Sequence, residues 1–161
     1  MNESRQPDRV EIIRDWWARN IAARDRPAAR ALAARLRRAD IVECLCHAEV
    51  HDLSRKLGLR DPARLAALVR VLAHVRDHKP RALAARMGDN DGSALRFERM
   101  VRATGDELPD QVLRVLPMIE NTCDVGWLGR DMLDWSDKTR ARWCFQYFDD
   151  RNESRPTEDV T

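Results

Sequence analysis

The sequence of 161 residues lacks any long apolar run. A membrane-spanning helix needs roughly 20 consecutive apolar residues, and the longest candidate here, Leu65 to Val75, is interrupted by Arg70. No apolar stretch near the N-terminus resembles a signal peptide. We therefore expect a protein of the cytoplasm with no membrane partner.

Motifs that mark common enzymes are also missing. The sequence contains no phosphate-binding loop, no dinucleotide fingerprint and no nucleophile elbow. It has only four cysteines, which in a reducing cytoplasm are expected to be buried or free thiols and not disulfides. We predict that the protein is not an enzyme and carries no cofactor.

Six glycines and little valine or threonine argue against a sheet-rich fold, because strands favour β-branched residues and end in turn residues. Apolar residues instead recur at helical spacing almost throughout. The sequence predicts helices over residues 9–24, 27–39, 41–57, 62–75, 80–87, 94–104, 109–120, 125–134 and 137–148. We expect an all-α bundle of about eight to nine helices with no sheet. It comprises an N-terminal lobe (1–88), a C-terminal lobe (93–148) and a disordered acidic tail (149–161).

Several residues predict where these helices begin and end. Asp40, Ser93 and Asp124 are expected N-caps, because a short polar side chain can accept a hydrogen bond from the first helical turn. Gly58 can end the third helix in a left-handed conformation. Pro117 is expected to bend the helix over 109–120, because proline has no backbone donor.

Charge is plentiful but uneven, although the formal net charge is only +2. Residues 1–102 carry 22 Lys or Arg against 14 Asp or Glu, whereas residues 103–148 carry 5 against 8. Of the 29 basic residues, 26 are Arg, whose planar fork of donors suits phosphate. This bias fits a nucleic-acid partner.

The basic residues gather in three segments. Residues 26–38 hold five arginines and no acid, so this run cannot be neutralised locally. Arg96, Arg99 and Arg102 follow at i, i+3 and i+6, within one broad helical face. The last helix adds Arg140 and Arg142. Regularly spaced cations on helices bind a phosphate backbone without reading its sequence.

Two histidine pairs at helical spacing, His47 with His51 and His74 with His78, raise the alternative of a helical metalloprotein. Neither pair has the His-Glu-x-x-His or Glu-x-x-His register that known helical metal sites use, so we predict no bound metal. Another alternative is a nuclease site whose metal would be held by the carboxylates of Asp124, Asp131 and Asp134. We interpret Asp124 as a cap and the other two as exposed helical positions.

The order of motifs along the chain resembles one family. Trp16-Trp17 is followed by Asp25-Arg26-Pro27-Ala28-Ala29-Arg30-Ala31-Leu32, Leu36-Arg37-Arg38-Ala39, Leu95-Arg96-Phe97-Glu98-Arg99-Met100-Val101-Arg102-Ala103, Val112-Leu113-Arg114-Val115-Leu116-Pro117, Asp131-Met132-Leu133-Asp134-Trp135 and Arg142-Trp143-Cys144-Phe145-Gln146-Tyr147-Phe148. Over residues 10–148 this set is similar to the CasB family, the small subunit of type I-E CRISPR effector complexes (Cascade). Residues 40–60 depart from the family pattern.

The resemblance implies a non-enzymatic helical subunit that pairs with a second copy of itself and contacts the backbone and large subunits of Cascade. It would bind guide RNA and target DNA without sequence preference and stabilise the R-loop and its displaced strand. Carried over position by position, the implied phosphate contacts are Arg38, Arg96, Arg102, Arg114 and Arg142. Arg37, Arg99 and Arg140 are added because they lie near these residues on the same helices.

A different class of protein remains an alternative, namely a dimeric helical regulator that reads a specific DNA sequence. It would need a recognition helix after a short turn, and the helix over 41–57 is the candidate. Glu43, Glu49 and Asp52 on that helix oppose contact with DNA.

Overall fold

A computed structural model describes residues 8–154 of the chain, with side chains described as far as Asp149. The described residues form α1 (Arg9–Asn20), α2 (Pro27–Arg38), α3 (Ile41–Leu45), α4 (Ala48–Leu57), α5 (Pro62–His74), α6 (Leu83–Gly88), α7 (Ala94–Arg102), α8 (Leu108–Val115), α9 (Val125–Leu133) and α10 (Asp137–Ser154). The predicted all-α fold is confirmed. The expectation of no sheet is wrong in one detail, because the described residues also contain a parallel pair of two-residue strands, β1 (Asp77–His78) and β2 (Thr122–Cys123).

Local capping chemistry sets several helix ends where the sequence predicts them. The Asp40 carboxylate accepts from the Glu43 backbone N–H at 2.8 Å, and Glu43 accepts in return from the Asp40 N–H, which completes a capping box at α3. Asp124 caps α9 by accepting from the Trp127 N–H. Gly58 ends α4 with φ +66°, the left-handed conformation that favours glycine.

Three differences from the predicted helices concern a break, a cap and a bend. The helix expected over 41–57 is divided into α3 and α4, and His47 is the N-cap residue between them. Ser93 precedes α7 without capping it; its buried hydroxyl donates instead to the Met87 carbonyl and bonds the Tyr147 hydroxyl. At Pro117 the expected bend is a 3₁₀ helix over Leu116–Ile119, because α8 has already ended at Val115.

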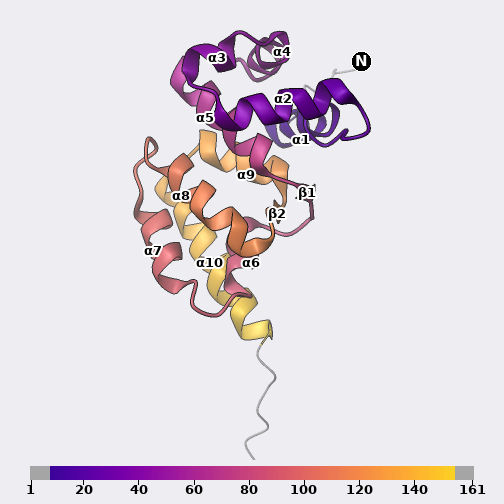
Figure 1. The fold of residues 1–161 in the computed structure, drawn as a ribbon. Coiled ribbons are helices and arrows are strands. Elements are labelled where there is room, and N and C mark those ends of the chain that lie inside the picture. The colour runs from indigo at the N-terminus through magenta and orange to yellow at the C-terminus, as the bar shows by residue number, and fades with distance from the viewer. Residues whose placement is uncertain (1–7, 155–161) are drawn as a thin grey trace, which may run out of the picture.

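The two parts of the chain pack on each other through α1 and α9. In Figure 1 α1 to α5 occupy the upper part of the molecule, α9 lies directly beneath them, and α6, α7, α8 and α10 lie below. Glycines allow the close approach, because a Cβ on Gly126 would lie 2.6 Å from the Val10 carbonyl oxygen. One hydrophobic cluster includes residues from both parts, and the predicted division near residue 88 stays a prediction.

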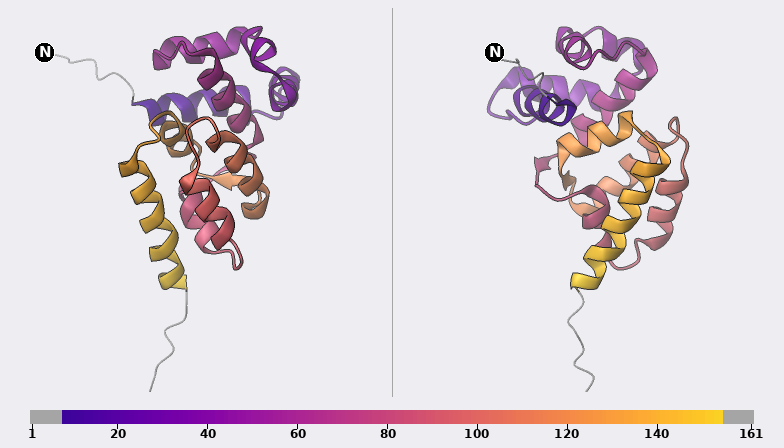
Figure 2. Two further views of the ribbon diagram at one scale, coloured as in Figure 1. Left: turned by 90° about the vertical axis from the view of Figure 1, so that its left-hand side faces the viewer. Right: turned by 180° about the vertical axis from the view of Figure 1, so that it is seen from behind.

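Helix α10 forms the long side of the lower part, as both views in Figure 2 show, and packs mainly on α6. It continues to Ser154, so the disordered tail predicted to begin at residue 149 is wrong for residues 149–154, and the remainder, 155–161, lies outside the described residues. Tyr147 on its buried face stacks on Phe97 of α7 with ring centroids 4.1 Å apart. Within residues 8–154, no helix has the length and hydrophobicity to cross a membrane.

Candidate nucleic-acid interface

Helix α2 presents a row of arginines to solvent because its leucines lie on the opposite face. Leu32 and Leu36 are buried at i and i+4, with Ala29 and Ala33 beside them, where α2 packs on α1 and α5. The arginines of α2 are exposed. Two arginines outside α2 lie beside this row, and we call the whole set the α2 basic surface: Arg24, Arg30, Arg35, Arg37, Arg38 and Arg76.

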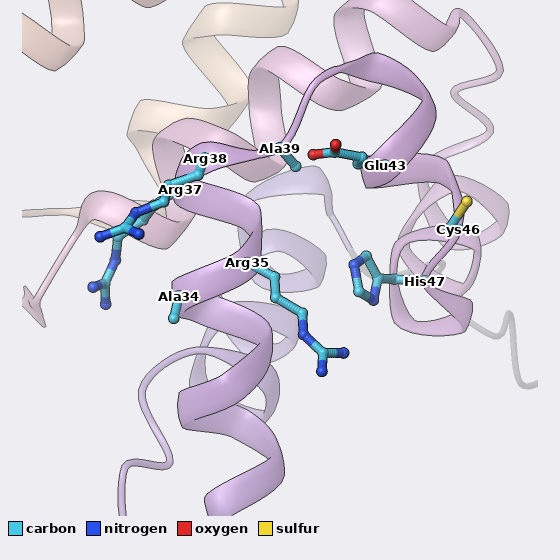
Figure 3. A pocket seen from close by; sticks show the side chains of 8 residues that line it. All are labelled: Ala34, Arg35, Arg37, Arg38, Ala39, Glu43, Cys46 and His47. Atoms are coloured by element: carbon cyan, nitrogen blue, oxygen red, sulfur yellow. The ribbon is translucent and has the colours of Figure 1, made fainter.

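A groove of about 670 Å³ lies on one side of this surface, between the end of α2 and the junction of α3 and α4. Its lining consists of Ala34, Arg35, Arg37, Arg38, Ala39, Glu43, Cys46 and His47. Figure 3 shows that Arg37 and Arg38 lie at one end and His47 and Cys46 at the other, with Arg35 projecting between them. The groove thus has a cationic end and a less charged end.

A second groove, of about 540 Å³, lies where α2 meets the end of α5. It is lined by Ile21, Arg24, Arg30, Ala33, Arg37, Ala73, His74, Val75, Arg76 and Asn121. Arg37 belongs to both grooves, so the two are adjacent on the α2 basic surface. No acidic residue is among the described residues that line this second groove.

Backbone carbonyls hold several of these arginines in place. Arg37 Nε donates to the Ala73 carbonyl at 3.0 Å, Arg30 Nη1 donates to the Arg24 carbonyl at 2.6 Å, and an Arg24 guanidinium N–H donates to the Arg76 carbonyl. A carbonyl orients a guanidinium without cancelling its charge. Since a guanidinium has five N–H donors, each of these arginines keeps donors for a ligand.

Carboxylates are few around the α2 basic surface. Asp77 lies 3.8 Å from Arg24 and 3.9 Å from Arg76, both in exposed ion pairs of the kind that is weak in water. Glu43 lines the first groove and is engaged in the capping box. Arg35 and Arg38 have no partner among the described residues. The surface is therefore strongly positive.

Three of the arginines implied by the resemblance, and Arg99, which was added because it lies near them, are on α7 and α8. Arg96, Arg99 and Arg114 are exposed and have no partner among the described residues, whereas Arg102 pairs with Glu98 at 3.2 Å. Helix α7 packs on α6, α8 and α10, while α2 packs on α1 and α5. The α7 arginines therefore form a region separate from the α2 basic surface.

On helix α10, Arg140 and Arg142 are bonded to other groups of the protein, unlike most of the arginines of α7. Both Nη atoms of Arg142 donate to the carboxylate of Asp131, at 2.7 and 2.9 Å, and these hydrogen bonds raise the pKa of Arg142 above its ordinary value. Asp131 is only 3% exposed and also accepts from Trp143 Nε1 at 2.7 Å, so its interpretation as an exposed position is wrong. Arg140 donates to the Ala103 carbonyl and lies 3.8 Å from Asp137.

With this geometry established, the chain can be compared with known proteins. Residues 28–148 match the family model of CRISPR-associated protein Cse2. The chain belongs to the Cse2 family. This assignment confirms the resemblance to CasB and makes the protein a subunit of the CRISPR Cascade complex. No curated protein and no solved structure matches the chain.

The four histidines of this Cse2-family chain are dispersed, and the rings of three of them are bonded to the backbone. The ring of His51 contacts the Leu45 carbonyl, that of His74 the Arg70 carbonyl, and His78 Nδ1 accepts from the Val125 N–H. His47 precedes α4, so it does not form a helical pair with His51. Within the described part of the chain, no three His, Cys, Asp or Glu side chains are grouped so that they could hold a metal.

Sequence reasoning missed several residues of the α2 basic surface. Arg30 and Arg35 lie in the run over 26–38 that was recognised as basic, but Arg24 and Arg76 were not singled out. Arg76 lies 38 positions after Arg38 in the sequence, and only the packing of α2 on α5 brings the two regions together. No local signal marks Arg76.

Proposed function

We propose that this protein is the non-catalytic small subunit of a type I-E Cascade complex and that its α2 basic surface binds a nucleic-acid backbone without sequence preference. In this role it stabilises the R-loop by supporting the displaced strand after guide RNA pairs with its target. The observation that carries the proposal is a set of six arginines around two adjoining grooves, three of which are held by neutral carbonyls and which few carboxylates oppose.

A displaced strand presents the same phosphate backbone whatever its sequence. Its sequence differs from target to target, but its phosphates recur at regular spacing. Cations that contact phosphate release condensed counterions and bind every sequence similarly. A surface rich in arginine, placed in grooves and lacking a catalytic constellation, supports this task.

The arginines of α7 and α8 form a second proposed contact region, comprising Arg96, Arg99, Arg102 and Arg114. Guide RNA, the target strand and the displaced strand are the proposed nucleic-acid partners of the two regions together. Protein partners are the backbone and large subunits and a second copy of the chain. Exposed apolar side chains such as Val42, Phe145 and Phe148 are suited to such protein contacts.

The proposal is tested by charge reversal in the assembled complex. Arg35→Glu/Arg38→Glu alters two exposed residues that bond no other described residue, so the fold should persist. We expect weaker binding of the displaced strand and a slope of log affinity against log salt that falls by roughly 0.7 to 0.9 for each lost phosphate contact. The loss should be equal on two unrelated target sequences.

Arg14→Glu/Arg60→Glu is the matched control. These exposed arginines undergo the same change of charge but line neither groove. Equal effects of the two double variants would show that net charge, and not the α2 basic surface, governs binding. An effect on only one target sequence would favour the sequence-specific regulator.

A further inference from the structure

The first groove is larger and less uniformly charged than phosphate binding requires. At about 670 Å³ it falls within the size range of small-molecule pockets. Two alanines contribute apolar surface to it, and its arginines lie together at one end and in the middle (Figure 3). Contact with phosphates accounts for the arginines but leaves Glu43, and His47 and Cys46 at the other end, unexplained.

The carboxylate of Glu43 is unexpected in a groove that binds only phosphate, because it repels the phosphate backbone. One of its oxygens accepts from the Asp40 backbone N–H at 3.3 Å, and the other bonds no described residue. A free carboxylate oxygen suits an N–H donor, and the exocyclic amines of cytosine and adenine are such donors. Figure 3 shows this carboxylate turned toward Ala39, so the groove offers an acceptor between its arginine end and His47.

His47 supplies a planar ring at the end away from Arg37 and Arg38 (Figure 3). As the N-cap residue of α4 it makes no side-chain capping bond, so its imidazole is not needed to begin the helix. Unpaired bases stack on aromatic side chains, histidine included. Its half-buried ring lines the groove beside the exposed Cys46.

We propose that the groove between α2 and the α3–α4 junction holds one unstacked base of the bound strand, with His47 against its face, Glu43 accepting from its amine and Arg35, Arg37 and Arg38 on the adjoining phosphates. This inference rests on the proposed function and extends it. The α2 basic surface then selects single strands, because the bases of a duplex are paired and stacked and cannot enter the groove.

The first test compares strands of equal charge with and without bases. The full-length chain is mixed with a single strand of about 12 nucleotides, with an abasic strand of the same length and with a duplex. We expect the wild type to prefer the base-containing strand over the abasic one. His47→Ala should reduce that preference about fivefold or more, and it should leave binding of the abasic strand and the duplex unchanged.

His51→Ala is the matched control, since His51 is exposed on the next turn and does not line the groove. Equal affinity of the wild type for abasic and base-containing strands would overturn the base site. So would equal effects of the two histidine variants. If neither strand binds, or if Arg35→Glu/Arg38→Glu leaves binding of the abasic strand intact, the proposed function itself fails.

A second test concerns Glu43. The wild type should bind oligo-dC several-fold more tightly than oligo-dT, because only cytosine has an exocyclic amine. Glu43→Gln retains a side chain that suits a capping box and should narrow this difference. Glu49→Gln changes an exposed acid of α4 that lies outside the groove, and it should leave the difference in affinity between oligo-dC and oligo-dT unchanged. If the Glu43→Gln variant keeps the full preference for oligo-dC over oligo-dT, Glu43 does not contact the base.

Discussion

Helices α2 and α10 both carry arginines that the resemblance assigns to phosphate, but the fold gives them opposite surroundings. On α2, Arg37 is held by a backbone carbonyl and Arg38 bonds no described residue. On α10, Arg142 donates two hydrogen bonds to the buried carboxylate of Asp131. The comparison teaches that the positive charge available to a ligand depends on the carboxylates that the fold places opposite each arginine.

The difference arises from the partner helices. Helix α2 lies on α5, where the Ala73 carbonyl accepts from Arg37. Helix α10 lies beside α9, which brings Asp131 under Arg142 and Trp143. An arginine paired with a buried carboxylate offsets the cost of burying that charge, so breaking the pair destabilises the fold. An arginine anchored by a carbonyl keeps its charge for phosphate.

The largest expected effect is that of removing the carboxylate from the α10 network. Asp131→Ala leaves the Arg142 guanidinium and the Trp143 N–H without their acceptor. We expect the free energy of unfolding to fall by about 3–5 kcal/mol, measured by urea denaturation. Asp106→Ala, in an exposed loop, serves as the control and should unfold like the wild type. A loss below about 1 kcal/mol, the scale of a typical single hydrogen bond, would show that the network contributes little.

Removing the cation from the same network should be less costly. In Arg142→Gln the Asp131 carboxylate retains its bond from Trp143 Nε1 at 2.7 Å. We expect a loss of about 1.5–3 kcal/mol, the range for hydrogen bonds to charged groups, and no change in the salt dependence of strand binding. A reduced slope of log affinity against log salt, with an unchanged free energy of unfolding, would show that Arg142 contacts phosphate.

Arg38→Gln should behave in the opposite way. Its side chain is exposed and bonds no described residue, so stability should change by no more than about 0.5 kcal/mol. One phosphate contact is lost, so the slope of log affinity against log salt should fall by roughly 0.7 to 0.9. Salt titration and urea denaturation of the same preparation check both expectations. A stability loss without a change of slope would refute the contrast between the two helices.

The smallest expected effect concerns the α7 arginines, which lie outside both grooves. Arg102 is partly neutralised by Glu98, so Arg96→Glu/Arg102→Glu should weaken strand binding in the assembled complex less than Arg35→Glu/Arg38→Glu does. The comparison needs both double variants on the same two target sequences. If the α7 variant proves the more damaging, α7 is the main nucleic-acid region.

The helices could be predicted from the sequence wherever their ends are set by local chemistry. Asp40, Gly58 and Asp124 act within a few residues of themselves, and each has the predicted role. The break between α3 and α4 was missed because Leu45 and Leu53 both fit one continuous apolar stripe. Ser93 was misjudged as a cap because its actual partner, Tyr147, lies 54 positions away.

The candidate site was predictable only in part, for a related reason. A run of arginines without acids is visible in the sequence, so α2 could be identified. Whether an arginine meets a carboxylate or a carbonyl depends on distant segments, as Arg142 with Asp131 and Arg37 with Ala73 show. The grooves themselves exist only once α2 packs against α5 and the α3–α4 junction.

The most direct test of the central claim locates the displaced strand relative to α2. A hydroxyl-radical reagent is tethered to Ala31→Cys, an exposed position on α2, in a chain whose exposed Cys46 is replaced by serine. Cys123 will not compete for the reagent, because burial raises the pKa of its thiol to about 12. In the assembled complex with an open R-loop, the account predicts cleavage of the displaced strand within a few nucleotides. Absence of that cleavage, together with strong cleavage from a reagent tethered to Leu95→Cys on α7, would contradict it.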